Sequence, residues 1–572
     1  MATPSRPWQL ISEPLPREML HGAAPLTPLQ VQLLTHRGIT DPDVMRQWLA
    51  ADTALVTTPL AMPDIARAVG RIKAAIAANE RIGVIGDCDA DGLTATAIIV
   101  ETLNILGVAD VAQFVAPRID DGRGLTMAAV EAMHADGVQL CITVDNGSSS
   151  VDEVTALLAL GIETIITDHH HLPEIRPAAY AIVNPQRTDG HYPHPELSGA
   201  GVALQLARAL LGDEDLTHQH VAPLVELAGL GILADAVPLG AENHTLIRLG
   251  IRQMITKARP GIRALFRMLG LIVENLGPRD LSFAIAPRLN AAGRLGDPYV
   301  ALKLLLATNL DDATQYAHQL DALNGERQRQ TETMFAEAHT QAIAQVAQDA
   351  PIIFVTHADW PMGLVGPVAG RLADEFGRLA VVVALHGEGC RGSLRGPRWF
   401  HIAEALGQCE PPLPQFGGHA QAGGFSAPCG QLPLIQQQLT AAYLGAMESD
   451  HSATQLTYQV DAMLPLERIT WDYARQVRNL APFGSHFAEP LFVSERLNLS
   501  KIRTVADRHL KFVAEQNGER RTFFWRYGST EFQHVKDHRL VDVIWRMPIS
   551  IYPSPSPEPG VVAICPVENG EA

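Results

Sequence analysis

The sequence predicts an α/β protein in which a parallel sheet is followed by a long helix, a second α/β unit and a β-rich tail. Short β-branched runs alternate with helix-like periodicity over residues 64–250, which indicates βαβ units on a parallel sheet. An Ala-, Gln- and Glu-rich stretch over about 311–348 has few helix breakers apart from Gly325. From about 455 to 565, short alternating strands predict a small barrel or sandwich.

These patterns divide the chain into five predicted parts. A length of 572 residues is enough for about four units of roughly 150 residues each. In the first α/β unit we expect strands at 82–86, 140–144, 164–167 and 181–183, and the second unit begins with a strand at 351–356. The predicted boundaries are an N-terminal extension over 1–60, a first α/β domain over 61–300, a connecting helix over 301–348, a smaller α/β domain over 349–450 and a β domain over 451–572.

Composition and charge exclude several classes of protein. With 47% hydrophobic and 19% charged residues the chain resembles ordinary folded proteins. Six cysteines without any C-x-x-C pair indicate neither a disulfide framework nor a zinc site. No apolar run approaches the roughly 20 residues of a membrane-spanning helix, and the start MATPSRPWQL lacks a secretory pattern, so we expect a cytoplasmic protein with no membrane partner. Because the net charge is −18, binding to a polyanion requires a local basic patch or bound cations.

Acidic residues follow the predicted strands of the first domain. The carboxyl ends of neighbouring parallel strands form the ligand crevice of such a sheet, so these side chains should converge. Burying so many like charges without compensation costs several kcal/mol each, and a cation is therefore required. The residues concerned are Asp87, Asp89 and Asp91 after 82–86, Asp145 after 140–144, Asp168, His169 and His170 after 164–167, and Asp235 after a later apolar run.

Two other interpretations of these acids are weaker. The D-x-D-x-D-G string also opens an EF-hand calcium loop, but position twelve is Ile98 instead of Glu and the preceding segment is a strand. A single Asp after a strand is often a helix N-cap, although this does not explain the whole set.

Carboxylates with one or two imidazoles and no thiolate favour Mn²⁺ or Mg²⁺, and two such ions are a known device for displacement at phosphorus.

The motifs around these acidic residues resemble those of a known family. The motifs GDCDADG, TVDNG, TDHH and GILADAVPL are similar, in this order, to the four motifs of the DHH phosphoesterase superfamily. Further segments resemble the bacterial RecJ nucleases, namely APRIDDGRGL, LSGAGVA, APRLNAAGRLGD, LNGERQ, GSLRG and FGGHAQAGGF. The resemblance covers about 80–490. It implies a DHH domain, a DHH-associated domain after the long helix, and an oligonucleotide-binding (OB-fold) barrel in the tail.

The resemblance also implies roles for individual residues. Two divalent ions would be held by Asp87, Asp89, Asp145, His169 and Asp235, with Asp145 and Asp235 as bridges. His170 would face the scissile phosphate, while Asp91, Asp168 and Asn146 would orient the ligands. Substrate phosphates would be contacted by Arg118, Arg294, Ser393, Arg395 and His419, of which Ser393 and Arg395 fit a pocket for the terminal 5′ phosphate. A surface ion pair is the alternative for each arginine.

Three segments depart from the family pattern. Trp360-Pro361-Met362-Gly363 lacks the histidine of a Trp-His-Pro-Gly-like turn, and Gly396 replaces a serine that often follows the GS-x-R arginine. The family's PFG-x-GNPEP string is PFGSHFAEP at 482–490. The first two departures concern the second domain and bear on efficiency or end selection, whereas the metal ligands are unaffected.

The implied function is metal-dependent hydrolysis of single-stranded DNA from the 5′ end to mononucleotides, in DNA repair and recombination. A DHH phosphodiesterase acting on short oligonucleotides or cyclic dinucleotides is an alternative, and so is a non-catalytic replication-fork scaffold. Expected partners are single-stranded DNA, a single-stranded-DNA-binding protein and a recombination helicase. Candidate phosphate contacts in the tail are Lys501, Arg503, Lys511, Arg520, Arg521 and Arg526.

Overall fold

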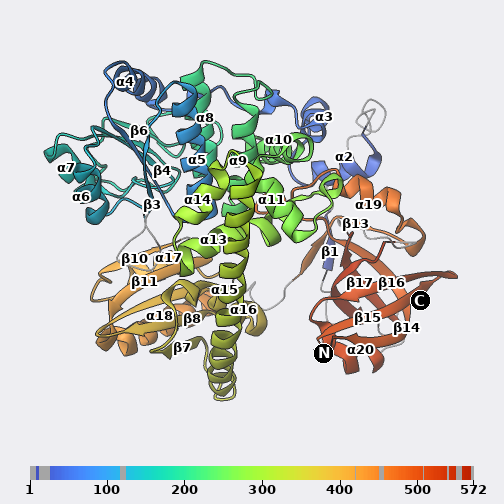
Figure 1. Ribbon diagram of the computed structural model, residues 1–572. Helices are drawn as coiled ribbons and strands as arrows, with labels where there is room; N and C mark the ends of the chain where they lie inside the picture. Colours follow the sequence, from blue (N-terminus) through green and yellow to red (C-terminus); the bar gives the residue numbers. More distant parts are fainter. Residues whose placement is uncertain are drawn as a thin grey trace.

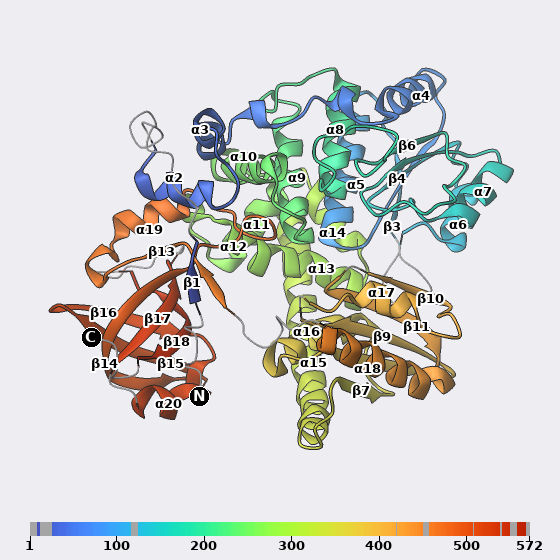
Figure 2. The same cartoon turned by 180° about the vertical axis from the view of Figure 1, so that it is seen from behind.

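The computed structural model describes residues 8–11, 26–115, 124–397, 399–418, 420–449, 457–506, 508–537, 540–548 and 557–567. Two α/β domains are joined by the long helix α15 (Leu310–Val346), and a C-terminal barrel lies beside them (Figures 1 and 2). The predicted α/β class, with its long connecting helix and β-rich tail, is confirmed. Within the described ranges, no helix has both the length and the apolar character needed to cross a membrane.

The first domain is built on a five-stranded sheet in which every neighbouring pair is parallel, in the order β3-β2-β4-β5-β6. Its strands are β2 (Ile82–Gly86), β3 (Ala112–Val115), β4 (Leu140–Val144), β5 (Glu163–Thr167) and β6 (Ala181–Val183). The chain passes from β2 to β3 on one side and then returns to β4 on the other side of β2. The carboxyl ends of β2 and β4 therefore meet at the point where the strand order reverses, which is where open α/β sheets bind ligands.

Helices cover both faces of this sheet because alternate strand residues point to opposite sides. Val84 and Ile142 belong to the core that includes α4 (Ile65–Ala77), α5 (Ala90–Ile105) and α8 (Gly199–Leu211). Ile85 and Cys141 belong to a separate core under the helices of the other face. Those helices are α6 (Met127–Ala135) and α7 (Val151–Ala159).

A helical layer completes the first domain and supports the start of α15. Its members are α9 (Ala222–Asp235), α10 (Ala241–Lys257), α11 (Pro260–Leu269), α12 (Pro278–Asp280), α13 (Ala286–Leu295) and α14 (Tyr299–Leu306), with a π-helical turn over Leu281–Ile285 before α13. The first half of α15 buries Ala313, Ala317 and Leu320 against this layer, and its second half buries Met334 and Ala338 in the second domain.

The second domain contains a mixed five-stranded sheet in the order β10-β11-β9-β8-β7. Its strands are β7 (Ile353–His357), β8 (Ala380–His386), β9 (Gly389–Arg395), β10 (Gln415–Gly418) and β11 (Ala422–Pro428). Its helices are α16 (Val365–Phe376), which shares a core with α15, and α17 (Ile402–Gly407) and α18 (Leu432–Ser449) in a second core.

The C-terminal sheet has the order β13-β14-β15-β16-β18-β17, and a further pairing of β14 with β17 closes it into a barrel. Its strands are β13 (Ala462–Met463), β14 (Phe492–Val505), β15 (His509–Gln516), β16 (Glu519–Trp525), β17 (Leu540–Arg546) and β18 (Gly560–Pro566). Two helices accompany it, α19 (Trp471–Arg478) and α20 (Phe532–Asp537). Of the barrel and sandwich alternatives, the barrel is the one observed.

The N-terminal segment ties the first domain to the barrel. β1 (Trp8–Leu10) pairs in parallel with β12 (Tyr458–Val460), which precedes the barrel. After α2 (Pro28–Thr35), Arg37 donates to both carboxylate oxygens of Asp461, at 2.9 and 3.3 Å. α3 (Pro42–Ala50), a helix absent from our expectations, packs on α10. The N-terminal segment thus contacts both the first domain and the C-terminal part of the chain.

Candidate metal centre

The acids predicted at the strand ends meet at the switch point between β2 and β4. Asp87 follows β2 directly and is buried. Asp89 is the N-cap of α5, where its Oδ1 accepts from the Gly92 N–H at 3.3 Å, so the N-cap interpretation also holds for this residue. Asp145 follows β4 with φ of +60°, a backbone conformation that non-glycine residues seldom adopt. The strained backbone turns a buried carboxylate into the crevice.

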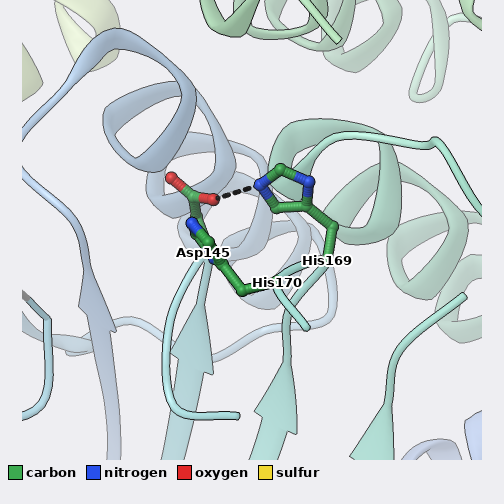
Figure 3. A group of neighbouring side chains, drawn as sticks. All are labelled: Asp145, His169 and His170. Carbon is green, nitrogen blue, oxygen red and sulfur yellow. Dashed lines mark ion pairs between the residues drawn. The ribbon is translucent and has the colours of Figure 1, made fainter. Parts of the chain in front are cut away.

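Three groups of side chains place their donor atoms within 4.8 Å of one another. The groups are Asp87, Asp89 and Asp145; Asp145, His169 and His170; and Asp91, His169 and Asp235. Asp145 and His169 each belong to two groups, and Figure 3 shows the Asp145 carboxylate facing the imidazole of His169. The predicted cluster is therefore brought together from three strand ends and one helix end.

The chemistry of these donors fits a divalent cation. Among the described residues, Asp145 Oδ1 and His169 Nε2 are buried atoms that have no hydrogen-bond partner, although they lie 3.1 Å apart. Burial, together with the neighbouring carboxylates Asp91 and Asp89, raises the pKa of Asp145 well above its usual range. A cation would satisfy both orphaned atoms and remove the repulsion between the acids. Carboxylates dominate the donor set, which suits Mn²⁺ and Mg²⁺.

Asp91 belongs to the third donor group and lies on the first turn of α5. Its carboxylate accepts from the Ser198 hydroxyl at 2.9 Å and from the N–H groups of Gly199 at 2.8 Å and Ala200 at 3.1 Å. Burial raises the pKa of Asp91 to about 7, and the nearby charge of Asp235 adds to this rise. The contacts of Asp91 therefore fix the start of α8 against α5.

Asp168, which directly follows β5, orients the side chain of His170. Its Oδ1 lies 2.8 Å from Nδ1 of His170, and its Oδ2 accepts from the Ser148 N–H at 2.9 Å. Burial acts to raise the pKa of Asp168, but the charge and hydrogen bond of His170 outweigh it and the pKa is lowered. The His170 side chain remains 45% exposed and can face a substrate.

Asp235 reaches the cluster from a helix end instead of a strand end. It is the last residue of α9, and its Oδ2 lies 3.6 Å from Nε2 of His169. A carboxylate at a helix C-terminus is disfavoured by the helix dipole, which adds to the repulsion from the other acids. This placement is a further reason to expect a cation beside Asp235.

Three asparagine side chains support the backbone around the cluster, and two of them, Asn290 and Asn184, were not expected from the sequence. The Asn290 side chain on α13 accepts from the Ala90 N–H at 2.7 Å, beside Asp89. Asn184 donates to the His170 carbonyl at 2.9 Å. Asn146, expected to orient ligands, donates to the carbonyls of Ile85 and Val144 and so links the ends of β2 and β4. Asn290 and Gly199 lie within motifs that we had recognised, APRLNAAGRLGD and LSGAGVA, but their contacts cross between segments distant in sequence.

Three of the predicted phosphate contacts lie in the described residues, Arg294 on α13 and Ser393 and Arg395 on β9 of the second domain. Ser393 and Arg395 share one face of β9 beside the start of α16, because a β-carbon on Gly366 would lie 3.4 Å from Ser393 Oγ and 3.8 Å from Arg395 Nη2. Arg294 on α13 donates to the Gly363 carbonyl at 2.6 Å, which joins the first domain to the second. Arg118 and His419 lie outside the described residues.

Three family models match the chain. Residues 81–232 match the model described as DHH family, N-terminal domain, residues 341–443 match the DHHA1 domain, and residues 460–554 match the RecJ OB domain. The model named for an OB domain covers most of the barrel, as the resemblance implied.

Among solved structures, RecJ of Thermus thermophilus in complex with Mn²⁺ superimposes with a TM-score of 0.81 at 27% identity, covering 98% of this chain and 80% of that chain. The Mg²⁺ complex of the same protein gives a TM-score of 0.75. Both ions expected here thus occur in structures of this fold.

Two sequence relatives carry the name single-stranded-DNA-specific exonuclease RecJ. The Bacillus subtilis protein is 34% identical over 85% of this chain and 61% of its own length. The Escherichia coli protein is 36% identical over 80% of this chain and 82% of its own length. This protein therefore belongs to the RecJ family of DHH exonucleases.

Proposed function

We propose that the protein hydrolyses single-stranded DNA from its 5′ end to mononucleotides, with two Mn²⁺ or Mg²⁺ ions at the switch point between β2 and β4. The observation that carries the metal assignment is the position of Asp145, whose carboxylate belongs to two donor groups at once. The names of the relatives support the DNA substrate, and the resemblance of the motifs supports the 5′ polarity.

In this proposal five residues hold the ions: Asp87, Asp89, Asp145, His169 and Asp235. Asp145 would bridge the two ions, and Asp235, whose Oδ2 lies 3.6 Å from Nε2 of His169, would be the second bridge. Divalent ions at such a site activate water and neutralise the charge that develops on the phosphate. Asp91 accepts from the Gly199 N–H at the start of α8, and Asp168 contacts the ring of His170. Both acids therefore act by positioning neighbouring residues.

His170 is the proposed donor to the phosphate oxygens. The contact between its Nδ1 and Asp168 fixes the ring orientation. The side chain is 45% exposed, and one of its ring nitrogens lies within 4.8 Å of donor atoms of Asp145 and His169. A donor held in place before the substrate arrives stabilises developing charge without reorganisation. His170 therefore contributes to catalysis through its position beside the metal ligands.

A pocket for the terminal 5′ phosphate is proposed at Ser393 and Arg395. Burial lowers the pKa of the Arg395 guanidinium, which donates to the Leu394 carbonyl at 2.8 Å and has no carboxylate partner among the described residues. The hydroxyl of Ser393 and the first turn of α16, with its positive dipole end, lie alongside. A phosphate would supply the counter-charge that Arg395 lacks. Arg118, Arg294 and His419 are proposed as further phosphate contacts.

The barrel is proposed to hold the strand through an exposed cluster at the ends of β15 and β16. The ring of His509 lies 5.3 Å from both Phe524 and Tyr527, and the Arg526 guanidinium lies 5.3 Å from the centre of the Tyr527 ring. Tyr527 is 60% exposed, and Arg508 is exposed beside it. Aromatic faces for bases and cations for phosphates are what proteins use to bind single strands.

The cations predicted to contact DNA divide into two groups. Lys511 pairs with Glu558 at 2.8 Å, Arg520 with Glu515 at 2.7 Å and Arg521 with Glu519 at 3.0 Å, so their charges are already matched within the barrel. Lys501, Arg503 and Arg526 are exposed and have no carboxylate partner among the described residues. The second group is therefore the better candidate for phosphate contacts.

The proposed substrate implies a role in DNA repair and recombination in the cytoplasm. Cooperation with a single-stranded-DNA-binding protein and a recombination helicase stays a prediction. The non-catalytic scaffold is disfavoured because every expected metal ligand is present and grouped.

Metal stoichiometry and product length test the proposal together. Titration of the metal-free protein with Mn²⁺ should show two ions per chain, and single-stranded DNA should yield mononucleotides. Cleavage restricted to dinucleotides or cyclic dinucleotides, or the absence of Mn²⁺ binding, would contradict it.

A further inference from the structure

The C-terminal part of the chain contacts the loop that leaves Asp235. We propose that the turn at residues 484–487 positions Asp235 for metal binding by bracing the loop at residues 236–240. This inference rests on the proposed function, in which Asp235 is a metal ligand. It gives a role to the PFGSHFAEP segment, which the proposed chemistry leaves unused.

One hydrogen bond and one close packing contact join the turn to the loop. The Leu239 N–H donates to the Ser485 carbonyl at 2.9 Å. A β-carbon on Gly484 would lie only 3.0 Å from Cδ1 of Leu239, whose side chain is buried. Leu239 is four residues from Asp235, which is at most about 14 Å of extended chain.

The turn is itself rigidly held. The Gly484 N–H donates to the Phe487 carbonyl at 3.0 Å and closes the turn. The buried ring of Phe487 packs on Phe483, Trp48 and His244, with centroid distances of 5.7, 4.9 and 5.3 Å. These residues come from the N-terminal extension, the first domain and the C-terminal part, so the turn is anchored to all three.

The loop is also held from its other side. The Asn243 side chain donates to the carbonyls of Pro238 at 3.0 Å and Glu196 at 2.9 Å. His244, on the first turn of α10, lies with Nε2 2.9 Å from the Leu480 carbonyl. The loop between α9 and α10 is therefore fixed between the first domain and the 480–487 segment.

Bracing is needed because Asp235 occupies an unfavourable position before an ion arrives. Its carboxylate stands at the C-terminus of α9, with a donor oxygen within 4.8 Å of one on Asp91, so electrostatic repulsion would move a free loop away. A loop fixed in advance lowers the cost of assembling the site. The C-terminal part then contributes to metal affinity as well as to strand binding.

The inference also predicts what removal of the C-terminal part would do. A barrel that served only to bind DNA could be removed after about Tyr443 without loss of turnover on very short strands. Removal of the turn would also release the loop beside Asp235. We therefore expect such a truncation to weaken Mn²⁺ binding.

The test compares two leucine-to-alanine variants of the full-length protein. Leu239→Ala removes the side chain that packs on Gly484, whereas Leu497→Ala removes a fully buried leucine of the barrel, opposite Val541 in the β14–β17 pairing. The Mn²⁺ dissociation constant is measured without DNA by calorimetry, with melting temperature in parallel. Loss of a residue that orients a ligand typically weakens metal binding roughly tenfold or more, so Leu239→Ala should show this loss and Leu497→Ala should not.

A second pair of variants repeats the test from the other side of the contact. Gly484→Val should also weaken Mn²⁺ binding, while Ser485→Ala should not, because only the backbone carbonyl of Ser485 is used. If Leu239→Ala binds Mn²⁺ as the unmodified protein does, or no more weakly than Leu497→Ala, the bracing role is wrong. If Asp235→Ala retains full Mn²⁺ affinity and activity, the fault lies in the metal assignment instead.

Discussion

Gly199 stands directly against the carboxylate of Asp145: a β-carbon at position 199 would lie 2.5 Å from Asp145 Oδ1. The same residue donates its N–H to Asp91 at 2.8 Å. One glycine at the start of α8 thus contacts a proposed bridging ligand and a positioning carboxylate at once. No larger residue fits unless Asp145 moves.

Gly199→Ala should therefore reduce hydrolysis by roughly ten- to a hundredfold, because displacement of a metal ligand disrupts the proposed two-ion geometry. Initial rates on single-stranded DNA with saturating Mn²⁺ provide the measurement. Gly70→Ala is the matched control, since a β-carbon there meets nothing within 4 Å. Equal rates for the two variants would show that the contact with Asp145 is unimportant.

Asp145→Ala should abolish hydrolysis and leave the fold intact. The removed carboxylate is shared by two donor groups, so its loss should weaken both ion sites together. Circular dichroism checks the fold, and Asp152→Ala, which removes an exposed acid on α7, should retain activity. Full activity of Asp145→Ala with Mn²⁺ supplied would refute the bridging role.

The central strands could be predicted because buried parallel strands appear in the sequence as continuous apolar runs. The expected runs at 82–86, 140–144 and 181–183 coincide with β2, β4 and β6. β3 was missed because it is a short edge strand containing a glutamine.

The grouping of the acids could be predicted from the sequence, because Asp87 and Asp145 lie close together if β2 and β4 are neighbouring parallel strands. Contacts between distant segments could not be derived in this way. Nothing in the local sequence shows that Asn290 supports the backbone beside Asp89 or that Glu558 neutralises Lys511. Such residues become recognisable only when the fold brings their partners together.

Arg395→Ala should impair strands with a 5′ phosphate more than strands with a 5′ hydroxyl, because the lost partner is the terminal phosphate. KM for the two substrates is the quantity to compare. Arg371→Ala is the control, because Arg371 on α16 already pairs with Glu332 at 2.8 Å. An equal effect of Arg395→Ala on both substrates would remove Arg395 from the end pocket.

Arg526→Ala should weaken binding of long single strands and make it less dependent on salt. Each phosphate contact contributes about 0.7 to the slope of log affinity against log salt concentration for single strands. Fluorescence anisotropy with a labelled strand at several salt concentrations measures this slope. Arg520→Ala should leave it nearly unchanged because Arg520 pairs with Glu515, and the reverse ranking would contradict our placement of the DNA path.

His244 should make the protein less stable in mild acid. Burial, with a smaller contribution from Arg248, lowers the pKa of His244 from 6.5 to about 3. Below pH 6.5 the unfolded chain binds a proton that the folded chain excludes, so this contribution to stability falls as the pH decreases toward 3. At pH 5.5 the loss is about 1.5 kcal/mol.

His244→Gln keeps a side-chain donor for Leu480 and cannot titrate in this range. Its melting temperature should therefore fall less between pH 7.5 and pH 5.5 than that of the unmodified protein. An identical fall in both proteins would show that His244 is not held neutral.

Digestion of end-labelled single strands tests the central claim most directly. The same strand, labelled at either its 5′ or its 3′ end, is incubated with Mn²⁺, with Mg²⁺ or with chelator. We predict that labelled mononucleotide appears at once from the 5′ label and only late from the 3′ label, with either ion and never with chelator. Early release of the 3′ label, or hydrolysis that persists in chelator, would contradict the account.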